Sequence, residues 1–123
     1  MGFTLIEVVV AASLLAIAVA PILKALTVAY VTSSAIEQKT FSLTYAQSKL
    51  DQIRLRSIYN YDTVYTTAGE SLGSSYFCKV QDTPESADLR TITVSVGFDS
   101  NGNGILSSDE IHVTLSTLIA RRY

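Results

Sequence analysis

The sequence has one cysteine, one histidine and no tryptophan among its 123 residues. The single cysteine, Cys78, excludes an intramolecular disulfide. One histidine and one cysteine supply neither a nucleophile–base pair nor a zinc-ligand pattern, and we therefore expect no enzymatic activity. The net charge of −2 provides no broad basic surface for nucleic acid, so we expect no nucleic-acid site.

Glycine is absent from residues 3–68, and Pro21 is the only proline there, which is what a long helix requires. Charge is also scarce, because Lys24 is the only charged residue in residues 8–36. A helix that is apolar on every face must be buried in lipid or in protein. With residues 3–6 added, the apolar run approaches the roughly 20 residues that cross a bilayer.

Beyond Lys24 the helical pattern becomes amphipathic, with charged and amide side chains on one side. We predict one helix from about Thr4 to about Ser57, with Pro21 kinking or locally melting it, because proline removes a backbone hydrogen bond. The apolar stripe of the second half should face a core, and it comprises Ile36, Leu43, Ala46, Leu50 and Ile53.

After Asn60 the apolar period changes to two, which is typical of strands with one buried face. His112 falls on the solvent side of this alternation, whereas Cys78 is expected to be a small buried hydrophobic residue. We predict strands at residues 76–80, 90–98 and 110–118, a loop at 61–73 and a turn-rich connection at 81–88.

The predicted fold class is therefore α+β. A long N-terminal helix, apolar in its first half and amphipathic in its second, packs on a small antiparallel sheet. In this interpretation residues 3–26 form the membrane-anchor segment, and residues 27–123 form a globular head.

The unusual residue of the apolar segment is Glu7, in the run GFTLIE of residues 2–7. Thr4 and Glu7 fit the capping-box pattern, in which the glutamate reaches back to free amides at a helix start. A carboxylate there also meets the positive end of the helix dipole. Capping explains why glutamate is tolerated, but it does not explain the preceding glycine–phenylalanine step.

GFTLIE followed by an unbroken apolar helix resembles the processing site and helix start of type IV pilins and of the pseudopilins of type II secretion. The resemblance implies that a prepilin peptidase cleaves between Gly2 and Phe3, so that residues 1–2 are a residual leader, and that the new N-terminus is methylated. It also implies that Glu7 pairs with the Phe3 amine of a neighbouring subunit. An unpaired carboxylate is penalised in an apolar bundle, so this pairing would set the axial register.

The resemblance predicts a structural subunit of a pilus-like filament, held by its N-terminal helix in the cytoplasmic membrane before assembly and exposed at the cell surface afterwards. Its partners would be copies of itself or related pilins. One alternative is a minor pilin or a type II secretion pseudopilin. An alternative of another class is a membrane-anchored calcium-binding module that never polymerises.

A second motif, DSNGNGILSSDE at residues 99–110, fits the spacing of an EF-hand calcium loop, with Gly104 at the sharp turn. Two strands flank it instead of two helices, and a plain hairpin connection is the alternative interpretation. With few carboxylates, binding should be weak and suited to extracellular calcium. The candidate ligands are Asp99, Asn101, Asn103, Ile105 through its carbonyl oxygen, Ser107 through water, and Glu110.

Overall fold

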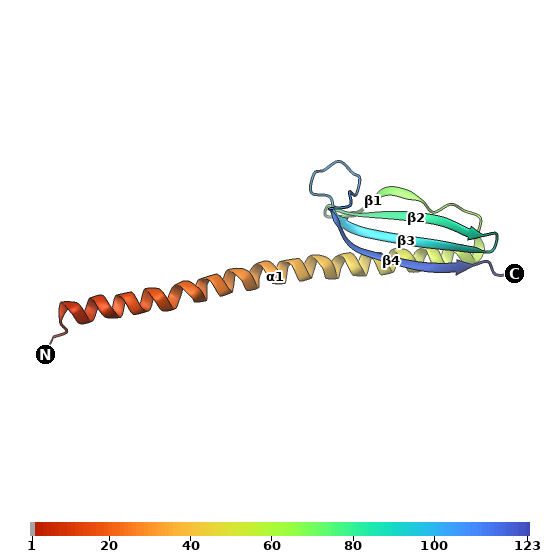
Figure 1. The fold of residues 1–123 in the computed structure, drawn as a ribbon. Coiled ribbons are helices and arrows are strands. Elements are labelled where there is room, and N and C mark those ends of the chain that lie inside the picture. The colour runs from red at the N-terminus through yellow and green to blue at the C-terminus, as the bar shows by residue number, and fades with distance from the viewer. Residues whose placement is uncertain (1) are drawn as a thin grey trace. The chain divides into compact units, whose positions relative to one another are not determined.

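A computed structural model describes residues 2–123 and confirms the α+β class. One helix is followed by four strands, which pair in the order β1-β2-β3-β4 with every neighbouring pair antiparallel (Figure 1). The elements are α1 (Leu5–Tyr59), β1 (Thr67–Gly73), β2 (Tyr76–Ser86), β3 (Leu89–Phe98) and β4 (Ile111–Ala120). The chain divides into two compact units, Met1–Glu37 and Gln38–Tyr123, which are described separately below.

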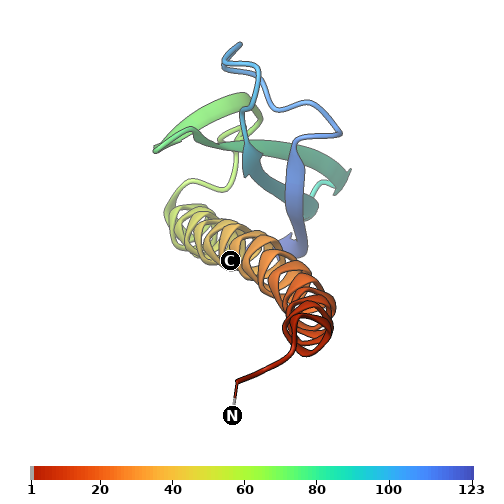
Figure 2. The ribbon, with the colours of Figure 1, turned by 90° about the vertical axis from the view of Figure 1, so that its left-hand side faces the viewer.

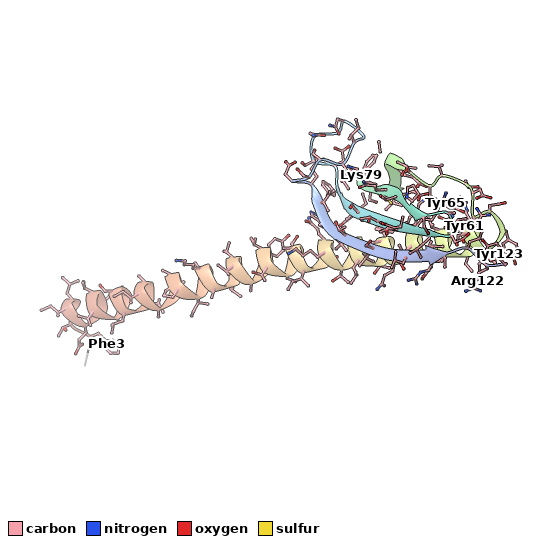
Figure 3. All side chains as sticks on the ribbon, turned by 45° about the vertical axis from the view of Figure 1, so that its right-hand side comes forward. Phe3, Tyr61, Tyr65, Lys79, Arg122 and Tyr123 are labelled. Carbon is pink, nitrogen blue, oxygen red and sulfur yellow. The ribbon has the colours of Figure 1, made fainter. Side chains whose placement is uncertain are left out.

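In the first unit, α1 has no partner element, and all the described side chains are exposed. Figure 3 shows these side chains projecting around the helix from Phe3 onward. The helix is continuous through Pro21, so the prediction of local melting there is wrong. Proline removes one ladder bond, but the flanking alanines and leucines are strong helix formers, and a helix that already exists propagates cooperatively.

In the second unit, the sheet packs one face on residues 38–59 of α1 (Figure 2). The core lies between these two layers and takes its side chains from the helix and the residue Tyr61 just after it, from β2 and β3, and from the end of β4. Its buried members are Ala46, Leu50, Ile53, Tyr61, Cys78, Val80, Ile92, Val94, Val96 and Ile119.

The predicted apolar stripe of the helix is right for Ala46, Leu50 and Ile53, which are all buried. It is wrong for Leu43, which is 39% exposed, and for Ile36, which is 59% exposed. The fully buried position is Ser42, one residue and about 100° around the helix from Leu43. Serine is polar, so an apolar pattern does not identify it.

Two strand boundaries differ from the prediction. The expected loop at residues 61–73 contains β1, a mostly exposed edge strand with irregular register that offers little apolar alternation. The expected turn at residues 81–88 is largely the second half of β2, which pairs with β3 as far as Ser86. Pro84 is tolerated because β1 pairs with β2 only as far as Val80, so the strand has an open side there.

His112 does not point simply to solvent, as the alternation predicted. Val96 pairs with Val113 and Gly97 pairs with Ile111, so His112 is the extra residue of a β-bulge. The bulge turns the ring toward the helix, and Nδ1 of His112 lies 3.3 Å from Oγ of Ser42. This contact provides a hydrogen-bond partner for the buried Ser42 hydroxyl.

The expectation for Cys78 is confirmed, because its side chain is fully buried on β2. Burial raises the pKa of the Cys78 thiol to about 11, above its ordinary value. The thiolate is therefore scarce at neutral pH, and this cysteine is a packing residue.

The backbone of β3 approaches the backbone of Glu110 closely at Gly97, near the end of the sheet. A Cβ atom there would lie 1.9 Å from the backbone oxygen of Glu110. Such a clash can be removed only if the backbone of residue 97 or residue 110 shifts. We expect Gly97→Ala to lower the free energy of unfolding by about 1–3 kcal/mol through overpacking. Thermal unfolding of the full chain in detergent, followed by near-ultraviolet circular dichroism, measures this.

Leu118→Ala is the matched control, because Leu118 is 62% exposed on the neighbouring strand. It should change the free energy of unfolding by no more than about 0.5 kcal/mol. Equal melting temperatures for Gly97→Ala and the unmodified chain would contradict the close approach.

Candidate functional site

The start of α1 is a reciprocal capping box. The backbone N–H of Thr4 donates to Oε2 of Glu7 over 2.9 Å, and the backbone N–H of Glu7 donates to Oγ1 of Thr4 over 3.3 Å. Thr4 is therefore the N-cap, and Glu7 occupies the third helical position, as the sequence predicted. The carboxylate satisfies one of the free amides of the first turn and meets the positive end of the helix dipole.

Gly2 and Phe3 precede the helix and are exposed, so the bond between them is accessible in a segment that is neither helix nor strand. Phe3 and Glu7 line one shallow groove with Ala11 and the residues beside it on the same helix face. Only Oε2 of Glu7 accepts a hydrogen bond from the described residues of its own chain. The arrangement thus places an exposed glycine–phenylalanine bond, an aromatic side chain and a carboxylate oxygen at the start of one helix.

The α1 helix is long enough and apolar enough to cross a membrane, and its apolar window is not buried by the described part of the chain. Length and composition support this statement, and the position near the N-terminus is where an anchor would be expected. Glu7 lies close to the N-terminal end of the apolar run of residues 3–23, where a carboxylate costs less than at the centre of a bilayer.

A second candidate site is the loop that joins β3 to β4, at one end of the sheet (Figure 1). Asp99 begins it and is 6% exposed. Its Oδ1 accepts from the amide of Gly102 over 3.0 Å, and its Oδ2 accepts from the amide of Gly104 over 2.8 Å. Both glycines have positive φ, 71° and 74°, which is the backbone conformation that lets the loop curl around the carboxylate.

Glu110 closes the loop and is also 6% exposed. Its Oε1 accepts from the amide and hydroxyl of Ser100, over 3.2 and 3.1 Å. Its Oε2 accepts from the amide and hydroxyl of Ser107, over 3.0 and 2.8 Å. Hydrogen bonds to the charged form, those from Ser107 first, hold the pKa of the Glu110 carboxyl below its usual value.

The neutral candidate ligands are arranged by short side-chain turns. Oδ1 of Asn101 accepts from the amide of Asn103, and Oδ1 of Asn103 accepts from the amide of Ile105. The Ile105 side chain is exposed, so the carbonyl is the group through which this residue would serve as a ligand. Within residues 2–123 no three acidic, histidine or cysteine side chains gather closely enough to hold a metal ion by themselves.

The loop thus buries two carboxylates, from its first and last positions, and the exposed Asn101 and Asn103 lie between these positions in the chain. Sequence reasoning identified both carboxylates but missed Ser100, whose hydroxyl and amide hold one oxygen of Glu110. A serine in a turn carries no distinctive signal, because its role depends on which carboxylate the folded loop brings to it.

Sequence reasoning also missed the ion pair that closes the opposite end of the sheet. Arg90 lies 3.1 Å from the buried carboxylate of Asp82 and donates to the carbonyl oxygen of Thr63 over 2.8 Å. Tyr61 lies between the guanidinium groups of Arg90 and Arg121, at 4.9 and 4.8 Å from its ring centroid. Figure 3 shows Tyr61 at that end of the sheet, near Tyr123 and Arg122. These contacts stabilise the link between α1 and β1.

Comparison with protein families finds the prokaryotic N-terminal methylation motif at residues 2–23. The matched residues include the Gly2–Phe3 step, the Thr4–Glu7 capping box and the apolar part of α1 as far as Leu23. Comparisons with curated proteins and with solved structures find no match. Residues 2–23 therefore carry the N-terminal methylation motif that is the prepilin signature of type IV pilins and pseudopilins.

Proposed function

We propose that the protein is a structural, non-enzymatic subunit of a type IV pilus-like filament, anchored in the cytoplasmic membrane before assembly and part of a cell-surface filament afterwards. The single observation behind this proposal is that the methylation motif begins a helix whose apolar first unit is exposed on every side. Such a helix needs cover from lipid or from other chains. A filament subunit uses both, first in the membrane and then in a helical bundle.

Glu7 is the residue we assign to assembly. One of its carboxylate oxygens is bonded to the Thr4 amide, and cleavage before Phe3 leaves that bond in place. The other oxygen can accept from the new amine of Phe3 on a neighbouring subunit. In an apolar bundle this pairing removes the cost of an uncompensated charge and selects one axial offset between neighbours.

Two alternatives remain for the class of subunit. A minor pilin or a type II secretion pseudopilin would use the same helix in a short filament or at a filament tip. A membrane-anchored protein that never polymerises would carry the same motif without forming a filament. Electron microscopy of filaments from cells, with the stoichiometry of the subunit, separates these three possibilities.

We expect Glu7→Ala and Glu7→Gln to leave the subunit in the membrane, because removing a charge makes insertion easier. Both substitutions should reduce filament yield by about tenfold or more, because the Phe3 amine loses its charged partner. Membrane fractionation and counting of filaments by electron microscopy measure the two effects.

Thr4→Ala is the control, since it removes the capping hydroxyl and keeps the carboxylate. It should cost the helix about 1 kcal/mol and leave assembly largely intact. Normal filament yield from Glu7→Gln would rule out the pairing mechanism.

A second prediction concerns processing by a prepilin peptidase. Mass spectrometry of subunits taken from filaments should find Phe3 at the N-terminus, carrying one added methyl group. Gly2→Leu is the matched variant, because a bulky side chain at the cleaved bond should leave the uncut form in the membrane. Assembled subunits that retain residues 1–2 would remove the peptidase step.

We further propose that the loop at residues 99–110 binds calcium, with Asp99, Asn101, Asn103, Glu110, the carbonyl oxygen of Ile105 and, through water, Ser107 as ligands. Burial of both end carboxylates supports this assignment, because calcium would meet preorganised acidic oxygens on the inside of the loop. Two carboxylates and neutral oxygens make a weak site, which is suited to millimolar extracellular calcium.

The calcium proposal predicts that the full chain in detergent melts at a higher temperature in millimolar calcium than in chelator. At a hundredfold excess over the dissociation constant, binding to the folded state alone contributes about 2.7 kcal/mol. Glu110→Gln should erase most of this difference, because it removes the carboxylate that closes the loop.

Asp109→Asn is the matched control, because it removes the same charge from the exposed neighbouring position. It should keep most of the calcium effect, and magnesium should replace calcium poorly because it requires compact octahedral geometry. Identical melting temperatures in calcium and in chelator would leave the loop as a plain connection between β3 and β4.

A further inference from the structure

Residues 25–36 of α1 form an uncharged surface, with apolar side chains interspersed with threonine and serine, that nothing in their own unit covers. This segment carries no charge, and its large side chains are exposed, with Leu26 at 62%, Val28 at 57% and Val31 at 60%. Exposed apolar surface of this extent on a helix indicates an interaction site.

A bilayer that holds the start of the helix does not reach this segment. The apolar run of residues 3–23 spans roughly 30 Å at about 1.5 Å per residue, which matches the hydrocarbon thickness. Glu7 and Lys24 then lie near the two ends of the spanning run, where charged groups reach the interfaces. Residues 25–36 continue beyond the hydrocarbon and require cover from protein.

Two opposite charges flank this segment, Lys24 before it and Glu37 after it. Among the contacts of residues 2–123, neither side chain has an ion-pair or hydrogen-bond partner. The step of 13 residues from Lys24 to Glu37 corresponds to roughly 20 Å along the axis and about 140° around it. The two charges therefore lie on different sides of one helix and cannot pair with each other within the chain.

Resting on the proposed filament, we propose that residues 24–37 are a contact surface for a second copy of this chain, with Lys24 of one subunit paired to Glu37 of another. Subunits that enter the same membrane through the same end have parallel helices, so the pair requires an offset of roughly 20 Å. Opposite charges on two sides of the helix give a heterologous contact, in which every subunit uses Lys24 toward one neighbour and Glu37 toward another. Such contacts do not close on themselves and propagate into a filament.

The pair has a physical role beyond attraction. Apolar helices can slide past one another at little cost, because one leucine or valine contact resembles the next. A charge that enters an apolar contact without a partner is strongly penalised. The Lys24–Glu37 pair therefore selects one offset in residues 24–37, separately from the contact assigned to Glu7.

Charge reversal in the full chain tests the pairing. Lys24→Glu and Glu37→Lys should each reduce filament yield by about tenfold or more, because each places like charges together. The double variant K24E/E37K should recover most of the yield, since the pair is restored with its signs exchanged. Filaments are counted by electron microscopy, and subunit levels are measured in the membrane fraction.

The matched control is K39E/E37K, which has the same net charge as K24E/E37K but reverses Lys39, a lysine outside the surface. It should not recover filament yield. Recovery by both double variants, or normal yield from Glu37→Lys, would overturn the pairing while filaments of the unmodified chain still support the proposed function. Absence of filaments from the unmodified chain would contradict the proposed function itself.

Cross-linking gives a readout that does not depend on charge. Cells that express a Lys24→Cys subunit together with a Glu37→Cys subunit should yield covalent dimers in their filaments when treated with a short bifunctional thiol reagent. Cells with only the Lys24→Cys subunit should not, because the native Cys78 is buried and rarely ionised. Filaments without mixed dimers would overturn the inference.

Discussion

The apolar first half of α1 has to be covered by something other than its own unit, and the rest of the molecule is arranged around that requirement. The helix exposes its large side chains from Phe3 to Ile36. Lipid can cover a length of about 30 Å, and a bundle of similar helices can cover the whole segment. In the proposed filament the same surface serves both states, so one sequence has to be compatible with a bilayer and with protein neighbours.

Charge placement follows from the same requirement. Only Glu7 and Lys24 are charged between Phe3 and Ile36, and each is costly in an apolar bundle unless it has a partner. The Thr4 amide and the helix dipole stabilise the Glu7 carboxylate within its own chain, which lowers the free-energy cost of burying it. In the proposed filament, the remaining need for partners would specify how subunits align, since apolar contacts alone discriminate poorly between offsets.

The second unit differs from the first because it covers its own apolar side chains in a core. Its core lies between one helix face and one sheet face, and the two ends of the sheet are closed differently. Arg90, Asp82 and Tyr61 stabilise the end where the chain leaves the helix. At the other end, the β3–β4 loop curls around Asp99 and Glu110, which leaves both carboxylates inside a short polar loop. That loop is where this unit buries two carboxylates close to its surface.

The sequence by itself determined the long helix, the methylation motif, the capping box, the buried helix positions Ala46, Leu50 and Ile53, and the alternation of β3. These follow from local patterns, because helix periodicity, capping and strand alternation are properties of neighbouring residues. Only the tertiary structure decided the edge strand β1, the extension of β2 through Pro84, the buried Ser42, and the bulge that turns His112 toward it. Each of these depends on which distant strand or helix supplies a partner. Pairing between residues far apart in the chain does not produce a periodic pattern in the sequence of either segment, so a local pattern cannot predict it.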